Sequence, residues 1–267
     1  MRTMLTIRGV SRSFAATQGG APTVALQATD LDVAENDFVT ILGPSGCGKS
    51  TLLRIVAGLD QPSSGEVLLD GKRIQGPGAD RGMVFQSYTL FPWLTVLQNV
   101  CFGLRERGLP REQQVDVARR FVGKVGLVGF ENHFPKQLSG GMQQRTAIAR
   151  ALANGPRMLL MDEPFGALDH QTREQMQELL LGIWEGDAVG ERKTVLFVTH
   201  DIDEAVFMGS RVIVMSARPG RIKLNRDVGL PHPRSYAVKT TQAFVALKAE
   251  LTEQVRTEVL AAQAAMG

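Results

Sequence analysis

The sequence predicts an α/β fold in which helices cover both faces of a mostly parallel sheet. Short, continuous apolar runs occur at 38–42, 158–161 and 194–198, and stretches with helical periodicity separate them. Such runs are typical of strands that are buried on both faces, because neither face meets water. With 267 residues, of which 43% are hydrophobic and 21% charged, the chain is long enough to bury a full core.

A glycine-rich loop follows the first apolar run and precedes a helical stretch at 52–57. The loop consists of Gly43, Pro44, Ser45, Gly46, Cys47, Gly48, Lys49, Ser50 and Thr51. A strand, a glycine loop and a helix N-terminus together turn successive backbone N–H groups toward one point, where they can hold phosphate oxygens. Lys49 can neutralise β- and γ-phosphates, and the Ser50 hydroxyl can ligate Mg²⁺. The loop therefore predicts a site for a nucleoside triphosphate.

Further strands are predicted from alternation and turn residues. A half-buried strand is expected at 26–33, where apolar residues alternate with polar ones. These apolar residues are Leu26, Ala28, Leu31 and Val33. The dipeptide Asp70 and Gly71 predicts a tight turn after a strand that begins at about Gly65, and 82–85 predicts another short strand.

Helical spacing of apolar residues extends from about 97 to 153, with a break at 108–110. A linker is expected at 231–234, and an amphipathic helix follows it. Its apolar positions are Phe244, Leu247, Leu251 and Val255.

Composition excludes several classes of protein. The net charge is +3 without a dense block of basic residues, so no nucleic-acid partner is expected. The two cysteines, Cys47 and Cys101, do not suggest a disulfide framework. Charged residues interrupt the first apolar positions, so no signal peptide is expected. The sequence contains no run of about 18 apolar residues, so no membrane-spanning helix is expected.

Two carboxylates follow the apolar run at 158–161. Because open α/β sheets place their ligands at the carboxyl ends of strands, Asp162 is positioned to hold Mg²⁺, directly or through water. Glu163 is positioned to polarise an attacking water as a general base. The alternative is a solvated turn, which is less probable beside a phosphate-binding loop.

A second helix N-terminus carries Ser139, Gly140 and Gly141. One interpretation is a helix capped by Ser139, with glycines in its first turn. The other is a second anion site, because a hydroxyl and exposed N–H groups meet at a positive helix end.

In their order and spacing these motifs resemble those of the ATPase subunits of ABC transporters. The matching positions are 43–51, Gln86, 138–145, 160–164, 167–169 and His200, within residues 1 to 225. The resemblance implies a P-loop NTPase fold with a RecA-like core, an antiparallel β subdomain and a helical signature subdomain. It implies an ATPase domain over 1–230, a helical subdomain at roughly 88–155, and a C-terminal linker and helical tail over 231–267.

The resemblance also implies roles and partners. ATP would lie between the phosphate loop of one chain and Ser139 to Gly141 of a second ATPase subunit, expected to be another copy of this chain. Gln86 would contact Mg²⁺ and the attacking water, and Asp169 would belong to the loop joining the two sites. His200, which alone would be interpreted as a surface residue, would contact the γ-phosphate. The catalytic set is then Glu163, His200 and Gln86, and the magnesium set is Ser50, Gln86 and Asp162.

Phe14 and Cys47, two further residues of the predicted site, each have a second interpretation. Phe14 lies where an aromatic ring stacks on adenine in the family, and the alternative is a small-core phenylalanine. Cys47 is expected to be a small loop residue that acts through its backbone N–H and not through its thiol. As a side prediction, the neighbouring helix dipole and Lys49 lower the pKa of the thiol, so that thiol reagents block nucleotide binding.

The segment from Ser87 to Val96 is rich in aromatic and apolar residues. It is either core of the helical subdomain or a groove for a helix of a membrane permease, and docking is favoured. The segments 76–82 and 215–222 and the tail resemble importers of nitrate, sulfonates and taurine. This resemblance implies an ATPase that powers import of a small solute with a separate solute-binding protein, at the cytoplasmic face of a bacterial inner membrane. The alternatives are an exporter subunit and a soluble ABC ATPase without a transport role.

Overall fold

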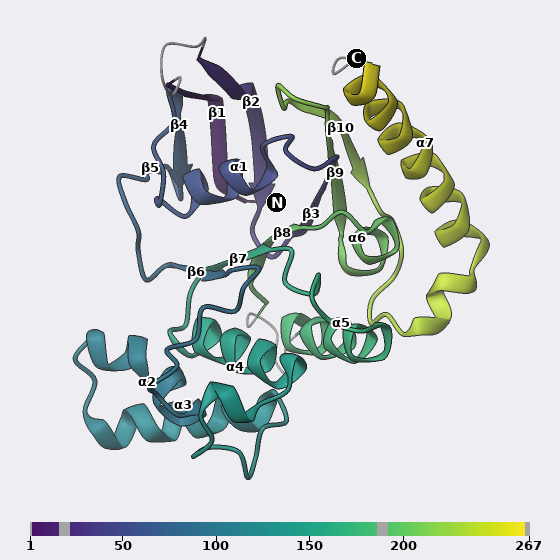
Figure 1. The fold of residues 1–267 in the computed structure, drawn as a ribbon. Coiled ribbons are helices and arrows are strands. Elements are labelled where there is room, and N and C mark those ends of the chain that lie inside the picture. The colour runs from purple at the N-terminus through teal and green to yellow at the C-terminus, as the bar shows by residue number, and fades with distance from the viewer. Residues whose placement is uncertain (1, 16–21, 186–191, 265–267) are drawn as a thin grey trace. The chain divides into compact units, whose positions relative to one another are not determined.

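The computed structural model describes residues 2–15, 22–185 and 192–264. It divides into two compact units, which are described separately (Figure 1). The first unit comprises Met1–Gly78 and Thr194–Gly267, and the second comprises Ala79–Lys193.

An antiparallel sheet in the first unit has the strand order β2-β1-β4-β5. Its strands are β1 (Thr3–Phe14), β2 (Thr23–Ala34), β4 (Ser64–Leu69) and β5 (Lys72–Arg73). Asp70 and Gly71 have φ values of 50° and 75°, so the predicted turn between β4 and β5 is confirmed. Strand β1 was not predicted, because charged and glycine residues interrupt its apolar alternation.

Strand β2 confirms the half-buried strand but not its regular alternation. Leu26, Leu31 and Val33 are buried, whereas Ala28 is exposed and Thr29 is buried instead. The register with β1 shifts between Thr29 and Leu26, where β2 has one residue more than its partner. Such a bulge moves the following residues to the opposite face of the sheet, which accounts for the wrong prediction at Ala28.

The parallel strands of the first unit surround β3 (Phe38–Leu42). It lies between β8 (Thr194–Val198) and β9 (Arg211–Met215), parallel to both, and β10 (Ile222–Asp227) is antiparallel to β9. Every residue of β3 and β8 is buried, as their apolar runs predict. The helices α1 (Lys49–Val56) and α6 (Ile202–Met208) complete this part of the unit.

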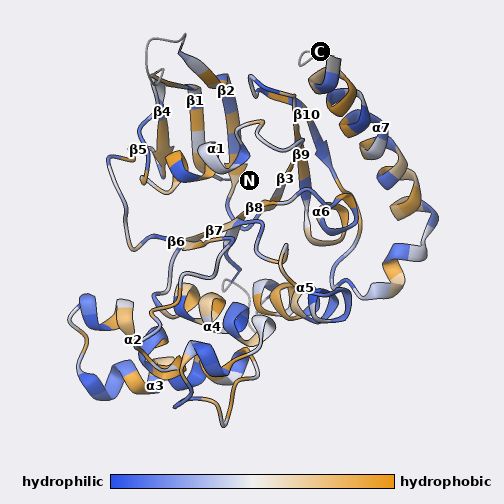
Figure 2. Cartoon of the chain, viewed as in Figure 1, coloured by the Kyte–Doolittle hydropathy of each residue, from blue (hydrophilic) through white to orange (hydrophobic). Residues whose placement is uncertain are grey.

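The C-terminal helix α7 (Gln242–Ala264) contains the predicted amphipathic helix, and Figure 2 shows hydrophobic and hydrophilic residues along it. Phe244, Leu247 and Leu251 are buried. A short 3₁₀ helix, Tyr236–Thr240, precedes α7. In the stretch expected to be a linker, Arg234 is buried and donates hydrogen bonds to the carbonyl oxygens of Val206, Phe207 and Gly209 at 2.8–3.0 Å. These bonds attach the linker to the C-terminal end of α6.

The second unit combines a parallel strand pair with helices. The pair is β6 (Arg81–Val84) and β7 (Met158–Asp162). The helices are α2 (Val96–Glu106), α3 (Arg111–Lys124), α4 (Gly140–Ala153) and α5 (His170–Glu185), with a 3₁₀ turn at Pro135–Gln137. Buried apolar residues of α2, α3 and α4 form one cluster, which includes Val100, Val122 and Ala149. The predicted helices and the break near Pro110 are confirmed. Residues 125–139 are not α-helical, so the prediction of helix was wrong there, and only the 3₁₀ turn interrupts this loop.

Within the described ranges, no helix is both long and apolar enough to cross a bilayer.

Candidate nucleotide-binding site

The glycine-rich loop lies in the first unit, between the end of β3 and the start of α1. Gly46 and Gly48 have φ values of 75° and 95°, which favour glycine over residues with a side chain. A Cβ atom at Gly48 would also lie 2.8 Å from the carbonyl oxygen of Ala25. Gly48 is the N-cap of α1 and gives it no side-chain cap. Backbone N–H groups at such a helix end are suited to binding an anion.

Lys49 is held inside this loop. Its side chain is buried, and its ammonium donates hydrogen bonds to the carbonyl oxygens of Gly43 at 2.8 Å and Pro44 at 3.0 Å. An ammonium has three N–H donors, so one remains to bind a phosphate oxygen. The loop thus places a cation beside the N–H groups of α1, which is the charge distribution that a polyphosphate requires.

His200 lies at the same edge of the parallel strands as the loop. Strand β8 pairs with β3 so that Val198 is opposite Ile41, and the N–H of Thr199 donates to the carbonyl oxygen of Ile41 at 3.1 Å. His200 therefore follows β8 just as Gly43 follows β3, and its side chain is exposed. An exposed imidazole at this edge can reach a ligand of the loop.

Phe14 is the last residue of β1, and its side chain is 40% exposed, so it is not a core residue. The guanidinium of Arg12 lies 4.7 Å from the centroid of the Phe14 ring and pairs with Asp60 at 2.8 Å. Arg12 thereby holds one face of the ring, and an exposed aromatic ring of this kind can stack on a base.

In the second unit, the parallel pairing of β6 and β7 brings Gln86 to the same edge as the two carboxylates. Val84 of β6 is opposite Met161 of β7, and Asp162 is the last residue of β7. Gln86 and the pair Asp162 and Glu163 therefore lie at the carboxyl ends of adjacent strands. Asp162 is 7% exposed, whereas Gln86 is exposed. Glu163 has a φ of 44°, a strained backbone conformation that concentrates at functional sites in proteins.

Ser139 caps α4, as one of its two interpretations predicted. Its hydroxyl accepts a hydrogen bond from the N–H of Met142 at 3.3 Å. Ser139 and Gly140 are exposed, whereas Gly141 is buried. A Cβ atom at Gly141 would lie 2.6 Å from the Thr172 methyl group on α5, so glycine allows the close approach of these helices. The cap leaves the hydroxyl proton of Ser139 available to an anion, so both interpretations are compatible.

Cys47 is buried, contrary to the expectation of a reactive thiol. Burial raises its pKa, and this effect outweighs the lowering by the charge of Lys49 and by hydrogen bonds from the backbone. The helix dipole and the lysine therefore do not produce a reactive thiolate. Cys47 and Cys101 are both unpaired thiols, as expected.

Two residues that the sequence patterns did not single out hold the segment after Gln86. Arg150 of α4 donates hydrogen bonds to the carbonyl oxygens of Tyr88 at 3.1 Å and Thr89 at 2.8 Å. Asn99 of α2 is fully buried, accepts from the N–H of Phe91 and donates to the carbonyl oxygens of Phe91, Leu94 and Thr95 at 3.0–3.2 Å. The long sequence separation between Arg150 and Tyr88 explains why no local pattern could identify the contact.

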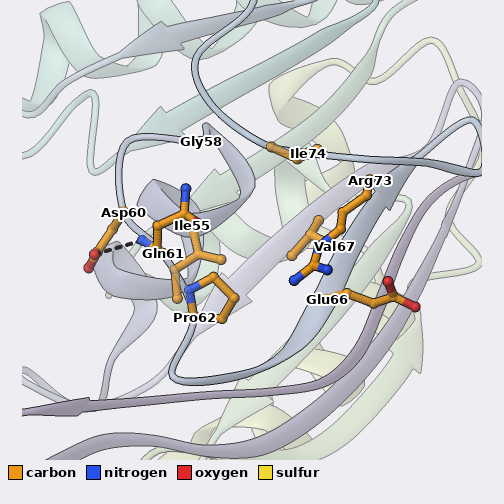
Figure 3. Close-up of a pocket in the computed structure, with 9 residues that line it drawn as sticks. All are labelled: Ile55, Gly58, Asp60, Gln61, Pro62, Glu66, Val67, Arg73 and Ile74. Atoms are coloured by element: carbon orange, nitrogen blue, oxygen red, sulfur yellow. Dashed lines mark hydrogen bonds between the residues drawn. The ribbon is translucent and has the colours of Figure 1, made fainter.

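A small depression on the first unit lies at the C-terminal end of α1, opposite the end that follows the phosphate-binding loop (Figure 3). Its lining residues are Ile55, Gly58, Asp60, Gln61, Pro62, Glu66, Val67, Arg73 and Ile74. Asp60 accepts a hydrogen bond from the N–H of Gln61 at 2.8 Å (Figure 3) and pairs with Arg12. None of the predicted site residues lines this depression.

Comparisons with known proteins agree with the motifs. The family model for "ABC transporter" matches residues 26–166. The uncharacterized ABC transporter ATP-binding protein MJ0412 of Methanocaldococcus jannaschii is 55% identical over 236 residues, which cover 88% of this chain and 86% of the relative. The nitrate import ATP-binding protein NrtD of Synechocystis is 46% identical over 258 residues, covering 94% of this chain and 95% of the relative. An aliphatic sulfonates import ATP-binding protein, SsuB of Bacillus cereus, is 45% identical over 250 residues with the same two coverages.

Solved structures agree with the predicted fold class. The dimeric ATP-binding cassette MJ0796 in a post-hydrolysis state bound to ADP and Pi is 36% identical and has a TM-score of 0.74. The match covers 85% of this chain and 100% of that one. Together with the family match, this likeness shows that the chain belongs to the ABC transporter family, as one of its ATP-binding and ATP-hydrolysing subunits.

Proposed function

We propose that this chain powers the import of a small solute, such as nitrate, a sulfonate or taurine, through a separate membrane permease. The observation that carries the proposal is its 45–46% identity, over 94% of its length, to ATP-binding proteins named for nitrate import and aliphatic sulfonates import. Substrate choice resides in the permease and in a solute-binding protein, both of which are separate chains in this proposal.

The first unit supplies the binding of the nucleotide. Residues 43–51 hold the phosphates through backbone N–H groups and Lys49, and Phe14 stacks on adenine. The placement of Lys49, with two of its donors used by the loop, supports this role because the cation is fixed before it meets the phosphates. His200 contacts the γ-phosphate from the neighbouring strand end.

The second unit supplies the catalytic groups and completes the site in a dimer. Glu163 accepts a proton from the attacking water, and Gln86 helps to orient that water. Ser139, Gly140 and Gly141 bind the phosphates held by a second copy of the chain. The dimeric state of the solved cassette MJ0796 supports this arrangement.

The donor set of Ser50, Gln86 and Asp162 fits Mg²⁺. All three offer oxygen atoms, which this hard cation prefers, and Mg²⁺ in such sites takes few protein ligands because phosphates supply others. When bound, Mg²⁺ neutralises charge on the phosphates.

Residues 87–96, here called the docking segment, form the surface that we assign to the permease. Trp93 is 69% exposed, and the ring of Phe91 lies 5.7 Å from that of Trp93 and 4.3 Å from that of Phe102. Val96 is buried, so the segment combines core and surface residues. An exposed tryptophan on a packed aromatic base is typical of an anchor for a partner helix.

The proposed import role also implies the domain boundaries, the location and the partners of the chain. The ATPase domain spans 1–230 with its helical subdomain at roughly 88–155, and 231–267 form a linker and helical tail. The chain acts at the cytoplasmic face of a bacterial inner membrane as a peripheral subunit. Its partners are a second ATPase chain, the permease and the solute-binding protein, without nucleic acid.

Growth of a strain that lacks this chain tests the proposal. Taurine, an alkanesulfonate or sulfate serves as the sole sulfur source in separate cultures, and nitrate as the sole nitrogen source in another. We expect a growth defect confined to one solute, rescued by the wild-type chain and not by Glu163→Gln. An unchanged growth rate on every source, in a host without a second importer for them, would contradict the proposed cargo. Accumulation of a solute in the mutant cells would favour the exporter alternative.

A further inference from the structure

The phosphate-binding loop, residues 43–51, lies against a segment that is far from it in the sequence. Residues 216–221, here called the support loop, connect β9 to β10. The N–H of Gly220 donates to the carbonyl oxygen of Ala25 at 3.1 Å, and its own carbonyl oxygen accepts from the N–H of Gln27 at 2.8 Å. A Cβ atom at Gly220 would overlap the carbonyl oxygen of Cys47. Glycine at 220 is therefore required for the present position of the phosphate loop.

The support loop is closed by its own hydrogen bonds. The N–H of Ser216 donates to the carbonyl oxygen of Arg221 at 2.9 Å, and the N–H of Arg221 donates to Oγ of Ser216 at 3.1 Å. Ser216 is 8% exposed. These two bonds join the ends of the support loop, and both Ala217 and Gly220 lie between the joined ends.

The C-terminal helix α7 holds the support loop through Glu258. Its carboxylate accepts hydrogen bonds from the N–H of Ala217 at 2.8 Å and from Nζ of Lys223 at 2.7 Å. Burial pushes the pKa of Glu258 upward, but the hydrogen bonds from Lys223 and Ala217 outweigh it, and the pKa lies below its usual range. Glu258 is therefore ionised at neutral pH, as this contact requires.

We propose that α7 sets the position of the phosphate loop through Glu258 and Gly220, which act as positioning residues for nucleotide binding. The chain of contacts runs from Glu258 to Ala217, through the support loop to Gly220, and from Gly220 to the backbone at Cys47. Displacing phosphate-binding N–H groups by a fraction of an ångström weakens every hydrogen bond that they donate to phosphate, whereas the catalytic groups stay in place. The inference rests on the proposal that residues 43–51 bind the nucleotide.

Titration of the purified chain with ATP and Mg²⁺ tests the role of Glu258. We expect Glu258→Ala to weaken ATP binding by roughly threefold to tenfold and to raise KM by a similar factor, with kcat little changed. Glu258→Gln keeps an acceptor for Ala217 but loses the charge, so its effect should be smaller. The matched control is Glu250→Ala, because Glu250 lies on the same helix and pairs with Arg226 of β10 at 3.1 Å without contacting the support loop. Equal ATP affinities for Glu258→Ala and the wild type would overturn the inference.

A second pair of variants tests Gly220. Gly220→Ala should lose at least about tenfold in ATP affinity, because its methyl group displaces the phosphate loop. Gly76→Ala is the control, since a Cβ atom there meets nothing within 4 Å. Should Gly220→Ala fail to fold, the Glu258 variants decide the question alone. Lys49→Ala distinguishes failure of this inference from failure of the proposed nucleotide site. If Lys49→Ala binds ATP as tightly as the wild type does, the assigned nucleotide site is wrong. If Lys49→Ala loses ATP affinity and Glu258→Ala does not, only the present inference is wrong.

Discussion

The guanidinium of Arg150 donates a hydrogen bond of 2.8 Å to the carbonyl oxygen of Thr89, at the start of the docking segment. Thr89 and the preceding Tyr88 have φ values of 47° and 45°. Such conformations cost about 1–3 kcal/mol each in residues other than glycine, and they persist because surrounding contacts hold them. Arg150 lies on α4, the helix that begins beside Ser139. One helix therefore carries both the N-terminus that we propose binds the phosphates of a second chain and the residue that holds the strained turn.

Substitution Arg150→Lys should lower the free energy of unfolding by about 1–3 kcal/mol, because an ammonium cannot reproduce the forked contact to two carbonyl oxygens. Urea unfolding measures the change. Arg105→Lys is the control. The guanidinium of Arg150 lies over the Phe91 ring and that of Arg105 over the Phe102 ring, but the Arg105 side chain is 57% exposed. Equal stability of the two variants would show that the contact of Arg150 contributes nothing.

Substitution Glu163→Gln should keep ATP binding and lower kcat by at least about 100-fold, because it removes the carboxylate that we propose as the general base and keeps the size of the side chain. The variant should accumulate as an ATP-bound dimer. Phosphate release and size-exclusion chromatography with ATP measure the two effects. Normal turnover would refute the assignment of Glu163 as the base.

Substitution Phe14→Ala should weaken ATP binding by about 1–3 kcal/mol, which is the usual contribution of a base stacked on an aromatic ring. Phe14→Tyr should bind ATP as the wild type does. Inorganic tripolyphosphate lacks the base, so its affinity should be the same in all three proteins. Phe130→Ala controls for loss of an exposed aromatic ring, because Phe130 is 39% exposed and Phe14 is 40% exposed. A parallel loss of tripolyphosphate binding would contradict stacking.

Alkylation of Cys47 should be slow at neutral pH, because burial raises the pKa of its thiol and the thiolate is the reactive form. The rate should increase as the pH rises toward and above the ordinary thiol pKa. Mass spectrometry after treatment with iodoacetamide measures labelling of the folded and the urea-unfolded chain. Rapid labelling of the folded chain at neutral pH would show an accessible thiolate.

The sequence predicted the parts of the fold that local patterns encode. The continuous apolar runs of β3, β7 and β8 identified buried strands, and the motif at 43–51 identified the turn into α1. Strand β1 was missed because its burial depends on pairing with β2 and β4, which its own residues do not reveal. The bulge near Ala28 was missed for the same reason.

The placement of the candidate site residues was predictable where a strand end fixes it, as for Asp162 and His200. The supporting residues were not predictable, because their contacts join distant parts of the chain. Arg150 contacts Thr89 across 61 positions, and Glu258 contacts Ala217 across 41. A single sequence contains no local signal for such pairs. Cys47 shows the converse, since its neighbours in sequence suggested a reactive thiol, whereas burial by residues far away in the sequence decides its pKa.

Helix α7 is attached by two kinds of contact, of which only one is weakened by salt. Its first turns are held by Phe244, Leu247 and Leu251, which are buried, and a later turn is held by the pairing of Glu258 with Lys223, whose side chain is 31% exposed. Added salt screens exposed and half-exposed charges but does not weaken apolar burial. The helix therefore stays attached while the ion pair with Lys223, which helps to orient Glu258 toward Ala217, weakens. Under our proposal for Glu258, nucleotide affinity should therefore depend on the ionic strength around the chain, without any change of fold.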